Sequence, residues 1–345
     1  MIPPQSKILI TGGTGFVGSH IVRHLIYLGY DNIVCIKRSE SSTALLGDTK
    51  DRVQWLDGDL LDLIFLEDAL QGVDTVIHAA AIVSYSNLDK KKMLQTAMDG
   101  TAYLINAALS NKIKKFIHIS SVAAIGRTKP VETIDESFIF SHSKYDTSYG
   151  LAKYLAEQEV WRGHAEGLNV TVLNPSTVLG AGFWNQTSLQ LFSKVYRGMK
   201  LYPGGATGWV NVWDVSQAVI NSILQDHNGE RFIISGENIS YQKILETVSN
   251  HLSIPPPTKK VPMRWSPLLW RIEAWRAYLS GTKPTITKET IMSSSVCSQY
   301  DTTKSVKVLK MQYRSIDASL RVACHLFMTT YPKDVHWAIS DFENP

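Results

Sequence analysis

Residues 7–23, KILITGGTGFVGSHIVR, decide the fold of this 345-residue chain. The stretch opens with an apolar run at residues 8–10, which is typical of a buried strand. Gly12, Gly15 and Gly18 follow at G-x-x-G-x-x-G spacing. A helical pattern comes next, with apolar residues at Ile21, Val22, Leu25 and Ile26. A strand, a glycine turn and a helix in this order predict the start of a βαβ unit.

Each glycine of this turn has its own physical reason. Gly12 lets the chain turn sharply off the strand, and Gly18 lets the helix pack closely against it. Gly15 leaves space for a pyrophosphate to approach the backbone, and the helix N-terminus offers N–H groups and a positive dipole end. The predicted dinucleotide-binding residues in this stretch are Gly12, Thr14, Gly15, Phe16, Val17 and Gly18.

The composition is that of a globular protein. The net charge of +4 comes from 35 basic and 31 acidic residues, an excess too small to indicate a nucleic-acid partner. The three cysteines form no C-x-x-C pair, and this pattern favours a reducing compartment. We expect no metal site. No apolar run approaches the roughly 20 residues of a membrane-spanning helix. A short polar leader, without a signal-peptide pattern, precedes the first strand, so we expect a cytoplasmic protein without a membrane span.

Strand-like and helix-like segments alternate through the first half of the chain. This alternation predicts an α/β fold of Rossmann type, a doubly wound parallel sheet with helices on both faces and right-handed crossovers. After the first strand, the expected strands are 33–36, 53–56, 73–78, 115–120 and 169–173, and the expected helices are 66–70, 90–110 and 148–165.

The pattern loosens after Asn174. We expect helices at 189–198, 215–225 and 241–252, and two short strands at 208–212 and 231–235. The predicted organisation is an NAD(P)-binding Rossmann domain at 1–175 and a smaller, mostly helical substrate-binding lobe at 176–345. The last Rossmann strands, at about 208–235, are expected to be interleaved with this lobe.

A Trp-rich segment at 265–279 places Trp270, Trp275 and Leu279 at helical spacing. Helices that lie on a membrane surface can show this pattern. Burial against the main domain is the commoner outcome for an apolar helical stripe, and we expect it here.

Tyr149 and Lys153 carry the strongest chemical signal after the glycine turn. Residues four apart on a helix share one face, so the Lys153 ammonium is expected beside the Tyr149 phenol. A nearby cation favours the phenolate and lowers a pKa that is ordinarily about 10. Tyr149 is therefore a candidate general acid or base. A serine at the end of the fifth strand precedes the pair.

With these motifs in this order, the chain resembles the extended branch of the short-chain dehydrogenase/reductase superfamily, which includes the NAD-dependent epimerase/dehydratase family. The resemblance covers nearly the whole chain. The motifs that carry it are 11–18 (TGGTGFVG), 58–59 (GD), 78–81 (HAAA), 120–121 (SS), 149–153 (YGLAK) and 174–180 (NPSTVLG).

The resemblance implies a role for each of three catalytic residues. Tyr149 would pass a proton to or from the substrate oxygen, and Ser121 would hydrogen-bond that oxygen. Lys153 would hold the nicotinamide ribose and lower the Tyr149 pKa. Ser121 is preferred to Ser120 because the family's hydroxyl usually lies five residues before a glycine, here Gly126.

The resemblance also implies further cofactor contacts. Asp59 would hydrogen-bond the adenine, with Leu60 beside it. The remaining contacts would come from Ala79, Ala80, Ala81, Tyr149, Lys153, Pro175 and Val178. One departure is visible, because the family often has Asn in an N-V-x-G-T segment where this chain has Ala97. A polar relay through that Asn is therefore not expected in its usual form.

The end of the second strand indicates which cofactor is used. NAD enzymes usually place an acid there to bind the ribose 2′-hydroxyl, whereas this chain has Lys37, Arg38 and Ser39. Two cations and a hydroxyl suit a 2′-phosphate, so we expect NADP, with NAD as the alternative.

Two related enzyme classes fit the chain less well. Nucleotide-sugar dehydratases place carboxylates after the active-site hydroxyl, where this chain has Val122 and Ala123. Nucleotide-sugar epimerases commonly carry an Arg within the segment that corresponds to 207–214, and this segment has none. The chain therefore looks closer to dihydroflavonol 4-reductases and 3β-hydroxysteroid dehydrogenases.

The expected activity is NADP(H)-dependent reduction of a small-molecule carbonyl to a secondary alcohol. A nucleotide-sugar epimerase is the alternative. A regulator that senses dinucleotides without catalysis is less favoured, because such relatives typically lose the Tyr or the Lys. Relatives often dimerise through the two helices after strands four and five, so a homodimer is one expectation.

Overall fold

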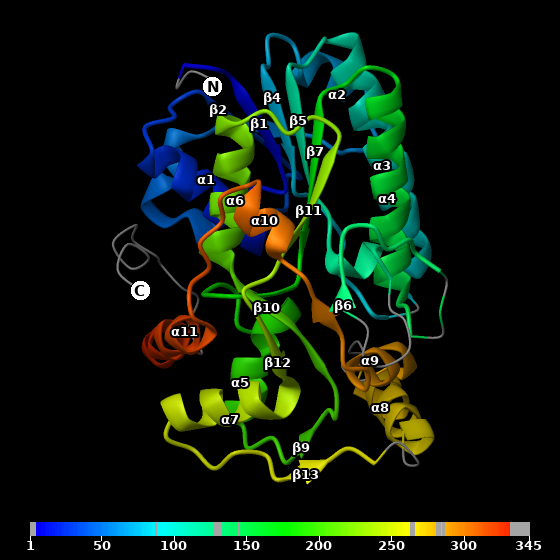
Figure 1. Ribbon diagram of the computed structural model, residues 1–345, viewed down its shortest axis with the longest axis vertical. Coiled ribbons are helices and arrows are strands. Elements are labelled where there is room, and N and C mark those ends of the chain that lie inside the picture. Colours follow the sequence, from blue (N-terminus) through cyan, green and yellow to red (C-terminus); the bar gives the residue numbers. More distant parts are fainter. Residues whose placement is uncertain are drawn as a thin grey trace.

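The computed structural model describes residues 5–86, 88–126, 133–141, 143, 145–262, 266–280, 284 and 287–331. Its centre is a seven-stranded sheet in which every neighbouring pair is parallel, in the order β11-β7-β5-β4-β1-β2-β3 (Figure 1). This confirms the predicted doubly wound α/β sheet. The strands are β1 Ile8–Thr11, β2 Ile33–Lys37, β3 Gln54–Asp57, β4 Thr75–His78, β5 Lys115–Ile119, β7 Val170–Pro175 and β11 Glu230–Ile234.

Helices cover both faces of this sheet (Figure 1). Because side chains alternate along a strand, Ile8 and Ile10 pack in one core with helices α1 and α6, while Leu9 packs in another with α2, α3 and α4. Strands buried on both faces explain the continuous apolar runs in the sequence. The five helices are α1 Phe16–Tyr27, α2 Leu63–Ala69, α3 Lys90–Ser110, α4 Ser148–Ala165 and α6 Val212–Leu224.

Side-chain caps set where several helices begin. Asp62 accepts a hydrogen bond from the Phe65 N–H at 3.0 Å at the start of α2, and Thr147 accepts one from the Gly150 N–H at 3.0 Å at the start of α4. These caps satisfy N–H groups that have no partner inside the helix. The second cap fixes the first turn of the helix that carries Tyr149 and Lys153.

A second sheet lies below the first in Figure 1, in the order β12-β10-β8. Its strands are β8 Thr177–Leu179, β10 Ala206–Asn211 and β12 Glu237–Ser240. The strand expected at 208–212 therefore forms, but it is not one of the strands of the parallel sheet. The reason is topological, because α6 carries the chain across the sheet to β11, and β11 occupies the edge beside β7.

An aromatic core holds the lower lobe together. Trp184, Phe192 and Phe327 are buried, and the Trp184 ring meets each of the other two edge to face at 5.3 Å. The helices around the lobe are α5 Gln190–Tyr196, α7 Tyr241–His251, α8 Ser266–Ser280, α9 Lys288–Ser294 and α11 Ile316–Thr330, while α10 Thr303–Lys307 packs against β11 of the parallel sheet. The short strands are β6 Thr133–Ile134, β9 Leu201–Tyr202, β13 Lys259–Lys260 and β14 Gln299–Tyr300.

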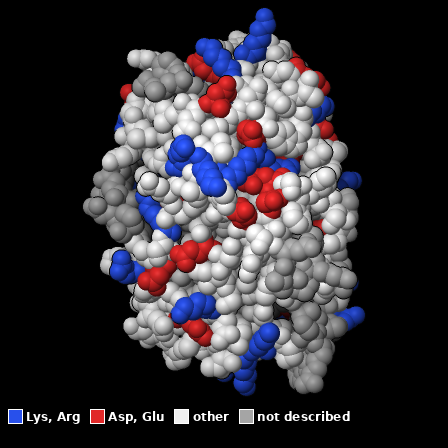
Figure 2. Space-filling model, viewed as in Figure 1, with Lys and Arg blue, Asp and Glu red and all other residues white. Residues whose placement is uncertain are grey.

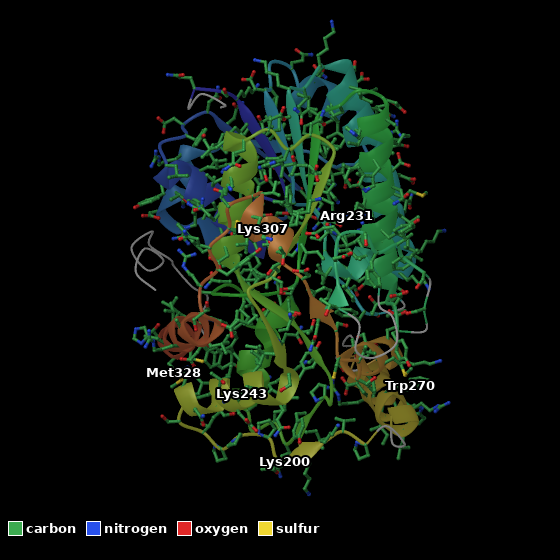
Figure 3. All side chains as sticks on the ribbon, in the orientation of Figure 1. Lys200, Arg231, Lys243, Trp270, Lys307 and Met328 are labelled. Atoms are coloured by element: carbon green, nitrogen blue, oxygen red, sulfur yellow. The ribbon has the colours of Figure 1, made fainter. Side chains whose placement is uncertain are left out.

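The prediction that the Trp-rich segment is buried is wrong for much of helix α8. Trp275 and Leu279 are each 72% exposed, and Leu268 and Ile272 are also exposed. Trp270, labelled in Figure 3, is only partly exposed, and the Arg271 guanidinium lies 4.6 Å from its ring centroid. Helical spacing placed these side chains on one stripe, but spacing does not state whether another element covers that stripe.

Among the described helices, none combines the length and the apolar character that a bilayer crossing requires. On the face shown in Figure 2, basic and acidic side chains are interspersed.

Candidate active site

The glycine turn has the geometry that its sequence predicts. Gly12 has φ +74°, and a Cβ added there would lie 2.6 Å from the Ala80 nitrogen. The Gly15 N–H donates to the Gly12 carbonyl at 2.9 Å, and a Cβ on Gly18 would overlap that same carbonyl. No side chain caps the start of α1, where Gly15 is the N-cap residue. The first N–H groups of α1 are therefore left for an anion, as a bound pyrophosphate requires.

A cavity of about 400 Å³ opens over this turn and continues to Ser121, Tyr149 and Lys153. Most of the predicted site residues line it, so the fold brings together residues from five separate motifs. Those that line it are Gly12, Gly15, Phe16, Val17, Gly18, Ala79, Ala81, Ser121, Tyr149, Lys153, Pro175 and Val178. Thr14, Lys37, Arg38, Asp59, Leu60 and Ala80 do not line it. The size and the bare backbone at one end fit a dinucleotide.

Ser121 and Tyr149 both line this cavity, and the Ser121 hydroxyl is near enough to the Tyr149 hydroxyl to oppose the rise of its pKa. Ser121 follows β5 and accepts from the Ala123 N–H at 3.1 Å, which fixes its side chain. The ring of Tyr85 meets that of Tyr149 edge to face, with centroids 6.2 Å apart. Two hydroxyls that line one cavity could both donate hydrogen bonds to a substrate oxygen placed between them.

Burial raises the pKa of Tyr149 above its ordinary value, the nearby Tyr85 raises it further, and the Ser121 hydroxyl opposes the shift. This differs from the prediction that Lys153 lowers the Tyr149 pKa. The Lys153 ammonium instead donates to the Ile119 carbonyl at 2.6 Å. In this structure Tyr149 is therefore a protonated phenol at neutral pH, which suits a proton donor.

Lys153 itself is almost fully buried, with 4% of its surface exposed. Burial lowers its pKa to about 8, while the Glu157 carboxylate raises it in part. A small cavity of about 20 Å³ lies on its far side, lined by His78, His118 and Ala97. The family often has Asn at the position of Ala97. In this chain two imidazoles and a small cavity lie near Lys153, and the usual amide is absent.

The buried carboxylate of Glu157 ties the catalytic helix to the sheet. Its Oε2 accepts from Ser120 Oγ at 2.6 Å and from Asn174 Nδ2 at 3.0 Å. Its Oε1 accepts from Trp161 Nε1 at 3.2 Å and forms an ion pair with Arg231, labelled in Figure 3. Glu157 is 0% exposed, so these partners must replace the water that it has lost.

The cations at the end of β2 are already paired within the protein. Lys37 lies opposite Asp57 in the parallel register of β2 and β3, and its Nζ is 2.5 Å from Asp57 Oδ1. Arg38 is exposed, with its Nε 3.2 Å from Glu40 Oε1. Gly58 donates to the Lys37 carbonyl at 2.9 Å, while the Asp59 carboxylate accepts from the Leu61 N–H at 3.0 Å. These residues lie at the carboxyl ends of neighbouring strands.

Sequence reasoning missed Glu157 as a residue of the site, and it did not single out Tyr85 within the pocket-forming loop that it expected at 82–88. Glu157 could have been found, because Tyr149, Lys153 and Glu157 are spaced four apart on one helix face. Tyr85 lies in a loop, and no periodicity predicts that its ring reaches Tyr149.

The chain is similar to known proteins over nearly its whole length. Residues 8–234 match the model of the NAD dependent epimerase/dehydratase family. The chain belongs to that family. It is 31% identical over 328 residues to a dihydroflavonol 4-reductase-like protein of Synechocystis sp., covering 92% of this chain and 93% of that protein.

Two solved structures have the same overall fold. A protein named gox2253 matches with a TM-score of 0.82 and 28% identity, over 95% of this chain and 100% of the other. A UDP-glucose 4-epimerase of Thermotoga maritima matches with a TM-score of 0.75, over 94% and 99% of the two chains. Its 21% identity shows a likeness of fold alone. As a member of this family with reductase relatives, the chain is an NAD(P)-dependent oxidoreductase of the extended short-chain dehydrogenase/reductase type.

We predict that Glu157→Gln lowers the free energy of unfolding by about 3–5 kcal/mol, because a neutral amide leaves the Arg231 guanidinium without its counter-ion. Urea unfolding measures the difference. Glu159→Gln is the matched control, since Glu159 is a partly exposed acid on the same helix, paired with Arg162, and should cost no more than about 1 kcal/mol. Equal losses in the two variants would show that the buried network does not hold the helix to the sheet.

Proposed function

We propose that this enzyme reduces a small-molecule carbonyl to a secondary alcohol with NADPH, using Ser121, Tyr149 and Lys153 as its catalytic residues. The observation that carries the proposal is that the hydroxyls of Ser121 and Tyr149 line the same cavity as Lys153 and the glycine turn. The reductase names among the relatives support the direction of the reaction.

The cofactor, when bound, supplies a hydride to the carbonyl carbon. Ser121 would hydrogen-bond the substrate oxygen as negative charge develops on it. Tyr149 would give that oxygen its proton, and its raised pKa keeps the proton in place until then. Lys153 would hold the nicotinamide ribose once its ammonium turns from the Ile119 carbonyl.

The remaining predicted contacts are proposals for the same cofactor. The glycine turn with Thr14 would bind the pyrophosphate, Asp59 and Leu60 would meet the adenine, and Pro175 and Val178 would lie beside the nicotinamide. Ala79, Ala80 and Ala81 would allow close approach of the cofactor after β4. We also propose that residues 176–345 form the substrate-binding lobe.

An epimerase acting on nucleotide sugars is the second candidate. The segment 207–214 carries no Arg, and its Trp209 is buried with its Nε1 donating to the Ile239 carbonyl at 3.0 Å. This segment therefore offers no cation to a diphosphate. Val122 and Ala123, which line the cavity beside Ser121, likewise offer no acid or base for dehydration.

NADP is the proposed cofactor because the end of β2 carries cations where NAD enzymes carry an acid. Both cations have an acidic partner, but Arg38 is the better candidate for the 2′-phosphate, because its pair with Glu40 is exposed on both sides and therefore weak, whereas Lys37 is more buried and closely paired with Asp57. We also propose that the protein is cytoplasmic and that it forms a homodimer through α3 and α4.

Tyr149→Phe should lower turnover by roughly 10²- to 10⁴-fold while cofactor affinity stays nearly unchanged, because only the proton-donating hydroxyl is lost. Steady-state rates and cofactor fluorescence titration measure the two effects. Tyr154→Phe is the control, since Tyr154 lies on the same helix but stacks on Phe140 outside the cavity. Wild-type turnover in the Tyr149→Phe variant would refute the assignment.

Arg38→Ala should weaken NADPH binding by about ten- to a hundredfold and leave NADH binding almost unchanged, because a charge-assisted contact to the 2′-phosphate is lost. Fluorescence titration with both cofactors measures this. Arg52→Ala, which removes an exposed cation paired with Asp31, should change neither affinity. Equal affinity of the wild type for NADPH and NADH would contradict the proposal.

The reaction type is tested by following NADPH absorbance with small aldehydes, aromatic ketones and ketosteroids, beside an assay for inversion of nucleotide hexoses. We expect stoichiometric NADPH oxidation by at least one carbonyl class. An epimerase would return the hydride to its intermediate, so hexose inversion without net cofactor consumption, and without oxidation by any carbonyl, would favour the second candidate.

A further inference from the structure

A second and larger cavity, of about 750 Å³, continues from the catalytic one. Val83, Tyr85 and Thr187 line both, so the two are joined beside the ring that contacts Tyr149. The second cavity lies wholly on the side away from the glycine turn, because none of the glycine-turn residues line it. It therefore offers space for the body of a substrate whose carbonyl lies at Tyr149.

One wall of this second cavity is a face of helix α5. Gln190, Ser193, Lys194 and Arg197 all line it, at the spacing of neighbours on a helix surface. The rest of the lining is more apolar and includes Met199, Leu201, Pro203, Val261 and Ile291. The cavity is thus apolar with one cationic wall.

The charges of this wall are unbalanced. Lys194 and Arg197 are the charged residues among the described lining, and no Asp or Glu joins them there. The Arg197 guanidinium donates hydrogen bonds to the Tyr331 hydroxyl, from Nε at 3.1 Å and from Nη2 at 2.5 Å. Tyr331 lines the same cavity and contributes a hydroxyl, not a carboxylate, to Arg197.

Lys194 is partly buried, and its ammonium has no hydrogen bond or ion pair within the part of the chain that the structure describes. Glu273 of α8 is close enough to raise its pKa, but burial lowers that pKa more strongly. Both carboxylate oxygens of Glu273 accept hydrogen bonds from Arg276, whose Nε and Nη2 each lie 2.7 Å from one of them. An ammonium that has lost part of its water without a direct partner favours binding of an anion.

We propose that Lys194, assisted by Arg197, binds an anionic group at the far end of the substrate, so that the substrate is an elongated carbonyl compound with an apolar body and an acidic end. The proposal rests on the proposed carbonyl reduction. Tyr149 lines only the first cavity and Lys194 only the second. The carbonyl and the acidic group would therefore lie in different cavities, joined beside Tyr85 and Thr187.

The test uses aryl keto acids of graded chain length, each beside its primary amide, and measures binding to the full chain by calorimetry. The wild type should bind a keto acid about ten- to a hundredfold more tightly than the matched amide, as expected for a charge-assisted contact. The preference should disappear in Lys194→Gln and return in Lys194→Arg, which restores the cation. Lys200→Gln is the control, because Lys200, labelled at the lower end of the lobe in Figure 3, is exposed and lines neither cavity.

Equal binding of acids and amides to the wild type, or a preference that survives Lys194→Gln, would overturn the proposal. Binding and NADPH oxidation are measured separately, so an acid preference without oxidation of NADPH by any carbonyl would support the anion site and contradict the reductase function. UDP is the third probe. Lys194-dependent binding of UDP, with no binding of keto acids, would overturn the acidic carbonyl substrate and favour the epimerase.

Discussion

The site depends on one buried charge, the Glu157 carboxylate. An ionised group that has lost its water must be hydrogen-bonded on every side. The partners of Glu157 come from its own helix, from β7 and β11, and from the residue that follows β5. Ser120 lies beside Ser121, and Asn174 also donates to the Ser121 carbonyl at 2.9 Å. Satisfying Glu157 therefore fixes the helix of Tyr149 and Lys153 relative to the backbone of Ser121.

The same carboxylate acts on the protonation of Lys153. Glu157 lies one helical turn beyond Lys153 and partly offsets the effect of burial, so the pKa of Lys153 falls only to about 8. Tyr149 lies two turns away from Glu157, and its pKa is raised by burial and by the nearby Tyr85. The helix thus holds a charged ammonium over much of the neutral range and a phenol that keeps its proton. That combination matches a site that gives a proton to a developing alkoxide.

The sequence predicted the parts of this protein that local chemistry determines. Glycines at positive φ or in close contact, apolar runs in the parallel sheet and the spacing of Tyr149 and Lys153 were all visible in advance. Features that depend on pairing between residues far apart in the sequence were not predicted. Strand register brings Asp57 opposite Lys37, and crossover topology sends β10 to the second sheet. The exposure of Trp275 depends on whether a neighbour covers it, and periodicity carries no information on that point.

Glu289 links the chemistry to the proposed recognition of the substrate's far end. Its carboxylate accepts from the N–H and the hydroxyl of Ser148, at 2.8 and 2.7 Å, in the first turn of α4 beside Tyr149. An acid at a helix N-terminus is also favoured by the helix dipole. Glu289 belongs to α9, whose Ile291 lines the second cavity. A wall that would contact the body of the proposed substrate is thus bonded directly to the helix that carries Tyr149. Binding energy gained far from the carbonyl can therefore act to position the carbonyl against Tyr149.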